Sequence, residues 1–259
     1  MLKFSANLSF LFADVPFLDR FARAAAAGFK GVEYMFPYAF AKEDIAERLR
    51  AHGLQQVLFN LPAGDWEGGE RGIGCHPERM EEFRAGVELA LEYALTLGCR
   101  RLNCLAGIAP AGVPEAELRR TFVANLRWAA EKFAPHGIAL LAEPINSRVD
   151  IPGFWLDRPA KGLEVLAEAG VGQLQYDLYH AQIMEGDLAR FLENHLGSIG
   201  HLQIADNPGR HEPGTGEIHY PFLFRHLLAL GYDGWIGCEY KPATTTEAGL
   251  GWLAAAGQA

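Results

Sequence analysis

Short apolar runs alternate with longer segments of helical periodicity along the whole chain. Segment 77–98 begins with Pro77, which suits the first turn of a helix, and ends at Gly98. Its apolar residues recur at spacings of three and four: Met80, Phe83, Val87, Leu91 and Leu95. Segment 115–136 carries a similar stripe: Leu118, Phe122, Leu126, Ala129 and Phe133. Both patterns predict helices that bury one face.

A weak repeat joins these helical segments to the apolar runs. Seven times a helical segment ends on a glycine, whose left-handed conformation closes the last turn, and a short apolar strand follows. The mean spacing of about 34 residues is the size of a βα unit. The glycines are Gly28, Gly53, Gly98, Gly137, Gly170, Gly197 and Gly231.

These seven copies and a first strand at 4–12 predict eight strands. Strands that alternate with helices favour a parallel sheet with helices outside. Eight such units in 259 residues predict an α/β protein with a (β/α)8 TIM barrel, as a single domain over 1–259. An open doubly wound sheet is disfavoured, because no G-x-G-x-x-G follows the first strand. The long loop 62–76 is expected to act as a lid.

Four polar residues lie at or near the ends of consecutive predicted strands: Glu143, Asp177, Gln203 and Glu239. The active site of such a barrel lies at the carboxyl ends of its strands, so these side chains are expected to converge. Asp177 alone would be taken as a helix N-cap. Three carboxylates in one apolar cup would repel each other, and a divalent cation is the usual remedy. Oxygen ligands favour Mg²⁺ or Mn²⁺.

Further polar residues lie near the same strand ends. His180 follows Asp177 by three residues, and His201 shares a strand face with Gln203; for each, a structural role is at least as plausible as a functional one. Lys241, two residues past Glu239, could point toward the barrel axis, and Arg71 lies in the middle of the loop 62–76; for either one, a plain surface position is about as plausible. Arg148 and Arg210 are expected to be solvated surface charges.

The composition narrows the function classes. A net charge of −9 disfavours binding to nucleic acid or to an anionic membrane, but a local basic pocket could still take a small anion. Four cysteines without a C-x-x-C pair indicate a reducing compartment, so the cytoplasm is expected. The N-terminus is interpreted as a strand, not a signal peptide. The chain carries no G-x-S-x-G, Walker or H-E-x-x-H motif.

Motifs over nearly the whole chain give a specific resemblance. The sequence resembles the hydroxypyruvate isomerase family, within the xylose-isomerase-like barrels. The motifs are FSANLSFLF, GVEYMFPY, NLPAGDWEGGERGI, EPIN, IPGFWL, QYDLYHAQ, GHLQIADNPGRHEPGTGEI and GCEYKPATTTEAGL. The resemblance implies that Glu143 and Glu239 are the acid/base pair. It also implies a divalent metal held by Glu143, Asp177, Gln203 and Glu239, where Gln203 is a neutral, weaker ligand than the His common in the wider superfamily.

The implied activity is the aldose–ketose interconversion of hydroxypyruvate and 2-hydroxy-3-oxopropanoate through an enediolate. His180, Lys241 and Arg71 are the candidate substrate-binding residues. The alternatives are isomerisation of a four-carbon 2-oxo acid (2-oxotetronate), sugar epimerisation, metal-dependent phosphodiester cleavage, and non-catalytic binding of a sugar acid. The expected partner is a small anionic 2-oxo acid, with no nucleic acid and no membrane. The chain could also form a homo-oligomer.

Overall fold

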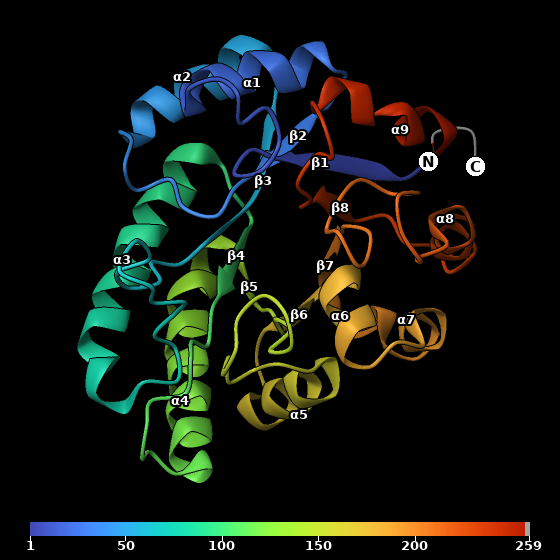
Figure 1. Ribbon diagram of the computed structural model, residues 1–259. Helices are drawn as coiled ribbons and strands as arrows, with labels where there is room; N and C mark the ends of the chain where they lie inside the picture. Colours follow the sequence, from blue (N-terminus) through green and yellow to red (C-terminus); the bar gives the residue numbers. More distant parts are fainter. Residues whose placement is uncertain (257–259) are drawn as a thin grey trace.

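The computed structural model describes residues 1–256, which form a closed barrel of parallel strands surrounded by helices (Figure 1). Strands pair in sequence order, and the last pairs with the first, so the sheet has no free edge. The predicted (β/α)8 barrel is therefore confirmed. The strands are β1 (Lys3–Asn7), β2 (Gly31–Glu33), β3 (Gln55–Asn60), β4 (Arg101–Cys104), β5 (Ala139–Ala142), β6 (Gln173–Asp177), β7 (Ile199–Ile204) and β8 (Trp235–Cys238).

The helices lie around the strands, and the last one returns to the start of the chain, where Trp252 packs edge-on against Phe4 with ring centroids 5.2 Å apart. None of the helices in residues 1–256 has the length and apolar character needed to cross a membrane. The helices are α1 (Phe17–Ala26), α2 (Lys42–His52), α3 (Met80–Leu97), α4 (Glu115–Phe133), α5 (Pro159–Ala169), α6 (Leu178–Met184), α7 (Leu188–His195), α8 (Tyr220–Ala229) and α9 (Gly251–Ala256).

The two helices predicted in detail are present, with one error in the buried stripe. All five stripe residues of α4 are buried, but Leu95 of α3 is 52% exposed. Three successive steps of four residues each overshoot a full turn by about 40°, so the stripe drawn through Leu95 rotates away from the core. The face of α3 that packs inward continues instead through Ala90, Ala94 and Leu97.

Glycine ends most of the helical segments as predicted. Gly98, for example, has φ 65° after α3, a left-handed conformation that closes the helix and turns the chain into β4. The exception is Gly197, which lies inside a short 3₁₀ turn (Leu196–Ser198) between α7 and β7. The repeat thus marks βα units correctly even where the local turn differs.

The loop 62–76 is fixed at its second half. Gly72 forms an isolated bridge to Ala106, and Cys75 N–H donates to Ala106 O at 2.8 Å. A Cβ at Gly72 would lie 2.6 Å from Leu105 O, so only glycine allows this close approach. The part nearer the tip, 64–71, is held mainly by bonds within the loop and by an ion pair from Glu70 to Arg79. Any closing movement would therefore be confined to 64–71.

Candidate active site

The four polar residues predicted at strand ends all lie at the carboxyl end of the barrel and are buried. Glu143 directly follows β5, Asp177 is the last residue of β6, Gln203 lies near the end of β7, and Glu239 directly follows β8. Each apolar strand carries its polar residue to the barrel mouth because all eight strands run the same way.

Glu143, Asp177 and His180 form a compact cluster, with one potential ligand atom from each lying within 4.8 Å of the others. Asp177 Oδ1 caps α6 by accepting from Tyr179 N–H at 2.8 Å, so the N-cap role and the site role coexist in one side chain. Its Oδ2 and the Oε1 of Glu143 are buried and have no hydrogen-bond partner within residues 1–256. Two unpartnered buried carboxylate oxygens that face each other suit a cation.

Glu239 lies beside a buried arginine. Arg210 donates from Nη2 to Glu239 Oε1 at 2.7 Å and from Nη1 to Asp150 Oδ1 at 2.9 Å. Its guanidinium also lies over the rings of Phe10 and Tyr179, at 5.1 and 5.2 Å. The expectation that Arg210 is a solvated surface charge is therefore wrong, since its side chain is only 13% exposed.

A left-handed backbone turns Arg210 into the site. Its φ is 54°, which is uncommon for a residue other than glycine and is not signalled by the sequence around it. Arg148, by contrast, is exposed as expected, and it donates to Ile183 O at 2.6 Å.

The amide nitrogen of Gln203 donates a hydrogen bond to Glu239. Gln203 Nε2 donates to Glu239 Oε2 at 2.6 Å and to Glu33 Oε1 at 2.9 Å, while its Oε1 accepts from Gln175 Nε2 at 2.7 Å. As a metal ligand, Gln203 would have to reverse its amide. Gln175 would then have to reverse as well, so that its Oε1, which has no partner among the described residues, accepts from Gln203 Nε2.

Glu33, at the end of β2, is a buried residue of this network that the sequence reasoning missed. It accepts from Ser5 Oγ at 2.7 Å, and His201 Nε2 lies 2.9 Å from its Oε2. Burial alone would raise the pKa of Glu33, but His201 and its hydrogen bonds lower it below the ordinary value. The stretch GVE is an apolar strand that ends on a glutamate, the same signal that identified Glu143.

An asparagine donates a hydrogen bond to one carboxylate oxygen of Glu143, and another asparagine does the same for Glu239. Asn103 Nδ2 donates to Glu143 Oε2 and Asn7 Nδ2 donates to Glu239 Oε2, each at 2.9 Å. Burial raises the pKa of Glu239 to about 8 although Arg210 opposes it, and burial with the charges of Glu239 and Asp177 raises the pKa of Glu143 well above its usual range. Burial also raises the pKa of Asp177 to about 6. Carboxyl groups in this state can exchange protons near neutral pH.

A cavity of about 240 Å³ opens above these groups. Arg71 and Lys241 both contribute to its wall, as expected, together with Glu143, Glu239 and His180. Arg71 lies over the ring of Trp66 at 4.4 Å and donates to Trp66 O at 2.9 Å, so it is held within its own loop. Lys241 is exposed, and its backbone N–H donates to Arg210 O at 2.8 Å.

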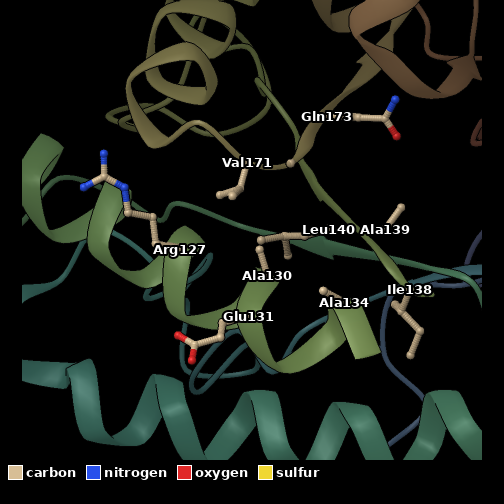
Figure 2. Close-up of a pocket in the computed structure, with 10 residues that line it drawn as sticks. Arg127, Ala130, Glu131, Ala134, Ile138, Ala139, Leu140, Val171 and Gln173 are labelled. Carbon is tan, nitrogen blue, oxygen red and sulfur yellow. The ribbon is translucent and has the colours of Figure 1, made fainter. Parts of the chain in front are cut away.

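A second cavity, of about 420 Å³, lies at the opposite end of the barrel, between α4 and the starts of β5 and β6 (Figure 2). Figure 2 shows Ala130, Leu140 and Val171 grouped in its wall, which is mainly apolar. Arg127 at its edge is already bonded to the last carbonyls of α5, at 2.7 and 3.0 Å. Its lining residues include no cluster of acids or nucleophiles, in contrast to the cavity at the carboxyl end, which Glu143, Glu239 and His180 line.

Comparison with known proteins agrees with this geometry. Residues 21–256 match the family model described as xylose isomerase-like TIM barrel. The chain is 52% identical to hydroxypyruvate isomerase of Escherichia coli K12 and 49% identical to 2-oxo-tetronate isomerase of Cupriavidus necator, with 98% of each chain covered in both cases.

A solved structure is similarly close. The crystal structure titled AP endonuclease, family 2 from Brucella melitensis superposes with a TM-score of 0.96 at 49% identity, covering 98% of this chain and 99% of that one. The fold, the motifs and the full-length identity lead to one conclusion: the chain is an isomerase of the hydroxypyruvate isomerase family, within the xylose isomerase-like TIM barrels.

Proposed function

We propose that the protein interconverts hydroxypyruvate and 2-hydroxy-3-oxopropanoate, with Glu143 and Glu239 as the acid/base pair. The observation that carries the proposal is the placement of two buried glutamates with raised pKa values at one cavity. The names of relatives that are about half identical support the same reaction. Environments that favour the protonated form allow one carboxyl group to donate a proton while the other accepts one.

The reaction moves a carbonyl group between adjacent carbons. One glutamate removes a proton from C3 of hydroxypyruvate, and the C–H electrons form the C2=C3 bond of an enediolate while O2 takes the negative charge. The other glutamate returns a proton to C2, and the proton of the C3 hydroxyl passes to O2, so that C3 becomes the aldehyde. Atoms and charge are conserved, and no external oxidant is needed.

Cations around the cavity match an anionic substrate. Arg210 already offsets Glu239 and Asp150, so the substrate carboxylate needs a further positive charge. Arg71 and Lys241 are proposed to supply it, because both line the cavity and neither forms an ion pair with another residue among the described side chains. The guanidinium of Arg71 could bind both carboxylate oxygens while its loop covers the substrate.

The donor set fits a divalent metal. The two unpartnered buried oxygens, Glu143 Oε1 and Asp177 Oδ2, would hold it, with Glu239 and a reversed Gln203 as the remaining proposed ligands. Oxygen ligands of this kind favour Mg²⁺ or Mn²⁺. When bound, such an ion supplies positive charge that stabilises the enediolate oxygens.

A four-carbon 2-oxo acid is the second candidate substrate. Relatives named 2-oxo-tetronate isomerase are 49%, 48% and 43% identical to the chain, close to the 52% of the hydroxypyruvate isomerase. Both reactions require the same proton transfers, so the glutamates do not discriminate between them. The residues that contact the far end of the substrate, at the cavity wall, would decide the preference.

We also propose that the protein acts in the cytoplasm on this small acid, without nucleic acid or membrane partners. All four cysteines are free and buried, which is consistent with a reducing compartment. A net charge of −9 also weighs against phosphodiester cleavage of DNA, since DNA binding requires neutralisation of the phosphates.

The test is a direct assay of the purified protein. Incubation with hydroxypyruvate, followed by NMR, should show 2-hydroxy-3-oxopropanoate, and the reaction in D₂O should place deuterium on carbon. A parallel assay with 2-oxotetronate gives the ratio of kcat/KM for the two acids. Binding of either acid without turnover would contradict the proposal and favour a sugar-acid binding protein.

A further inference from the structure

The side chain of Asn146 has one possible orientation. Its Oδ1 accepts from two backbone donors, Val149 N–H and Asp150 N–H, each at 3.0 Å. Its Nδ2 therefore faces the other way, and it lies 2.5 Å from Asp150 Oδ2 and 2.7 Å from His180 Nδ1. Reversing the amide would direct its nitrogen at two N–H groups and its oxygen at a carboxylate.

This orientation determines the tautomer of His180. Because Asn146 presents an N–H donor, His180 Nδ1 has to accept and cannot carry a hydrogen. The ring is then neutral with its hydrogen on Nε2. Nε2 points toward the cluster, 3.9 Å from Glu143 Oε1 and 3.7 Å from Asp177 Oδ2, and His180 also lines the cavity.

We infer that Asn146 is a positioning residue that holds His180 as a hydrogen-bond donor, with Nε2–H directed into the catalytic cavity. A nitrogen that carries a hydrogen has no lone pair for a metal, so His180 is excluded from the ligands although it lies within their reach. The catalytic part of the inference rests on the proposed function. A neutral imidazole aimed at the reacting oxygens can donate to the oxygen on which negative charge develops.

Asn146 reaches the site from a short turn after β5. Glu143 and Asn146 are both part of the stretch EPIN. This stretch therefore provides a proposed proton-transfer group and the residue that orients His180. Asp150, in the same turn, accepts from Asn146, Tyr179 and Arg210. The carboxylate of Asp150 reinforces the amide orientation, because it also requires a donor at Nδ2.

The test is the tautomer of His180 in solution. Long-range proton–nitrogen NMR spectra of protein labelled with ¹⁵N-histidine distinguish protonated from unprotonated ring nitrogens, and His180→Gln assigns the signal among the nine histidines. The expected result is unprotonated Nδ1 and protonated Nε2. A wild-type spectrum with hydrogen on Nδ1 would overturn the inference, whatever substrate the enzyme uses.

Two variants separate positioning from structure. Asn146→Asp replaces the donor by an acceptor and should move the hydrogen of His180 to Nδ1, whereas Asn146→Ala should give a mixture. In both, kcat should fall by about 10²-fold, the cost of one misdirected donor, while KM changes little. Ser147→Ala, which removes only a bond to Asp157, is the matched control.

The outcomes are distinct. An unchanged tautomer in Asn146→Asp, or an unchanged kcat with the tautomer reversed, would contradict the inference. If Asn146→Asp does not fold, the wild-type spectrum and Asn146→Ala still decide it. If the tautomer is as expected but hydroxypyruvate is not turned over, the proposed function fails while the orientation of His180 stands.

Discussion

Each glutamate of the proposed acid/base pair has one oxygen engaged by an asparagine and the other directed elsewhere. Asn103 and Asn7 hold Oε2 of Glu143 and Glu239, whereas Oε1 of Glu143 has no partner among residues 1–256 and Oε1 of Glu239 meets Arg210. The two carboxyl groups therefore have the same kind of partner at Oε2 but different surroundings at Oε1. This difference is how one pair can divide the donor and acceptor roles.

Replacement of either glutamate by glutamine should abolish most of the activity. Glutamine keeps the volume and the asparagine contact but cannot transfer the proton, so we expect kcat to fall by about 10²-fold or more in Glu143→Gln and in Glu239→Gln. Circular dichroism should remain that of the parent. Turnover near the parental rate in either variant would show that the acid/base assignment is wrong.

The raised pKa values predict how stability depends on pH without metal. Glu239 rises from 4.5 to about 8, and Asp177 from 3.8 to about 6, so the folded chain binds more protons than the unfolded chain over that window. Stability rises with pH only where the unfolded state binds more protons, so these groups lower it as pH increases from about 5 to 8.

Thermal unfolding in chelator should therefore show a Tm that decreases from pH 5 to pH 8. Glu239→Gln should have a shallower slope, and the exposed Glu67→Gln should keep the parental one. A divalent ion should restore stability mainly at the higher pH, because it binds the charged carboxylates. If the dependence of Tm on pH has the same slope in all three proteins, Glu239 does not have a raised pKa in the folded chain.

Metal affinity should separate the carboxylates from His180. Calorimetric titration with Mn²⁺ should show weaker binding by at least about tenfold in Glu143→Gln and Asp177→Asn. His180→Gln should bind Mn²⁺ nearly as well as the parent, since its Nε2 is expected to carry a hydrogen. A large loss in His180→Gln would identify the imidazole as a ligand.

The sequence predicted the site where a strand ends on a charge, and it failed where a loop supplies the residue. Glu143 and Glu239 follow apolar strands, so the pattern alone placed them at the barrel mouth. Glu33 carries the same pattern and was overlooked. Arg210 could not be placed, because its direction depends on a left-handed backbone in a loop whose path the sequence does not specify.

At the scale of elements, periodicity predicted the helices well and their exact faces less well. The stripe of α4 is buried throughout, whereas in α3 it turns away at Leu95. Steps of three and four must alternate to follow 3.6 residues per turn, and a run of fours does not. The glycine repeat succeeded because the end of a helix imposes a backbone requirement that few other residues meet.

Arg71, in the loop 62–76, and Lys241, in the segment after β8, are proposed to bind the substrate carboxylate. We expect Arg71→Met and Lys241→Met to weaken kcat/KM for hydroxypyruvate far more than for dihydroxyacetone, which lacks the carboxylate but offers the same carbonyl and hydroxyl. The reason is that each variant removes one positive charge from the cavity wall. Kinetics on the two substrates give the ratio directly.

Glu78→Gln, exposed beyond the fixed end of the loop, is a suitable control for nonspecific effects on this region. An equal decrease of kcat/KM on both substrates would show that neither Arg71 nor Lys241 binds the carboxylate. A selective loss in Arg71→Met alone would assign recognition to the loop, and one in Lys241→Met alone would assign it to the segment after β8.

At the scale of the whole molecule, ring closure brings together residues that are far apart in the chain. Asn7 and Glu239 are separated by 232 positions, yet they share a hydrogen bond because β1 pairs with β8. An open doubly wound sheet would leave β1 away from the last strand, so this contact requires the barrel. The fold and the proposed acid/base site therefore depend on the same strand pairing.

The fully buried bonds between Ser5, Glu33, His201 and Gln203 join three strands beneath the cavity, whereas Arg71 lies in a loop above it. This separation bears on how such an enzyme can evolve. The proposed acid/base residues are anchored at the ends of the strands, whereas the proposed carboxylate-binding Arg71 lies in a surface loop. Descendants can thus acquire longer or shorter acids as substrates through changes at the rim while the acid/base pair stays in place.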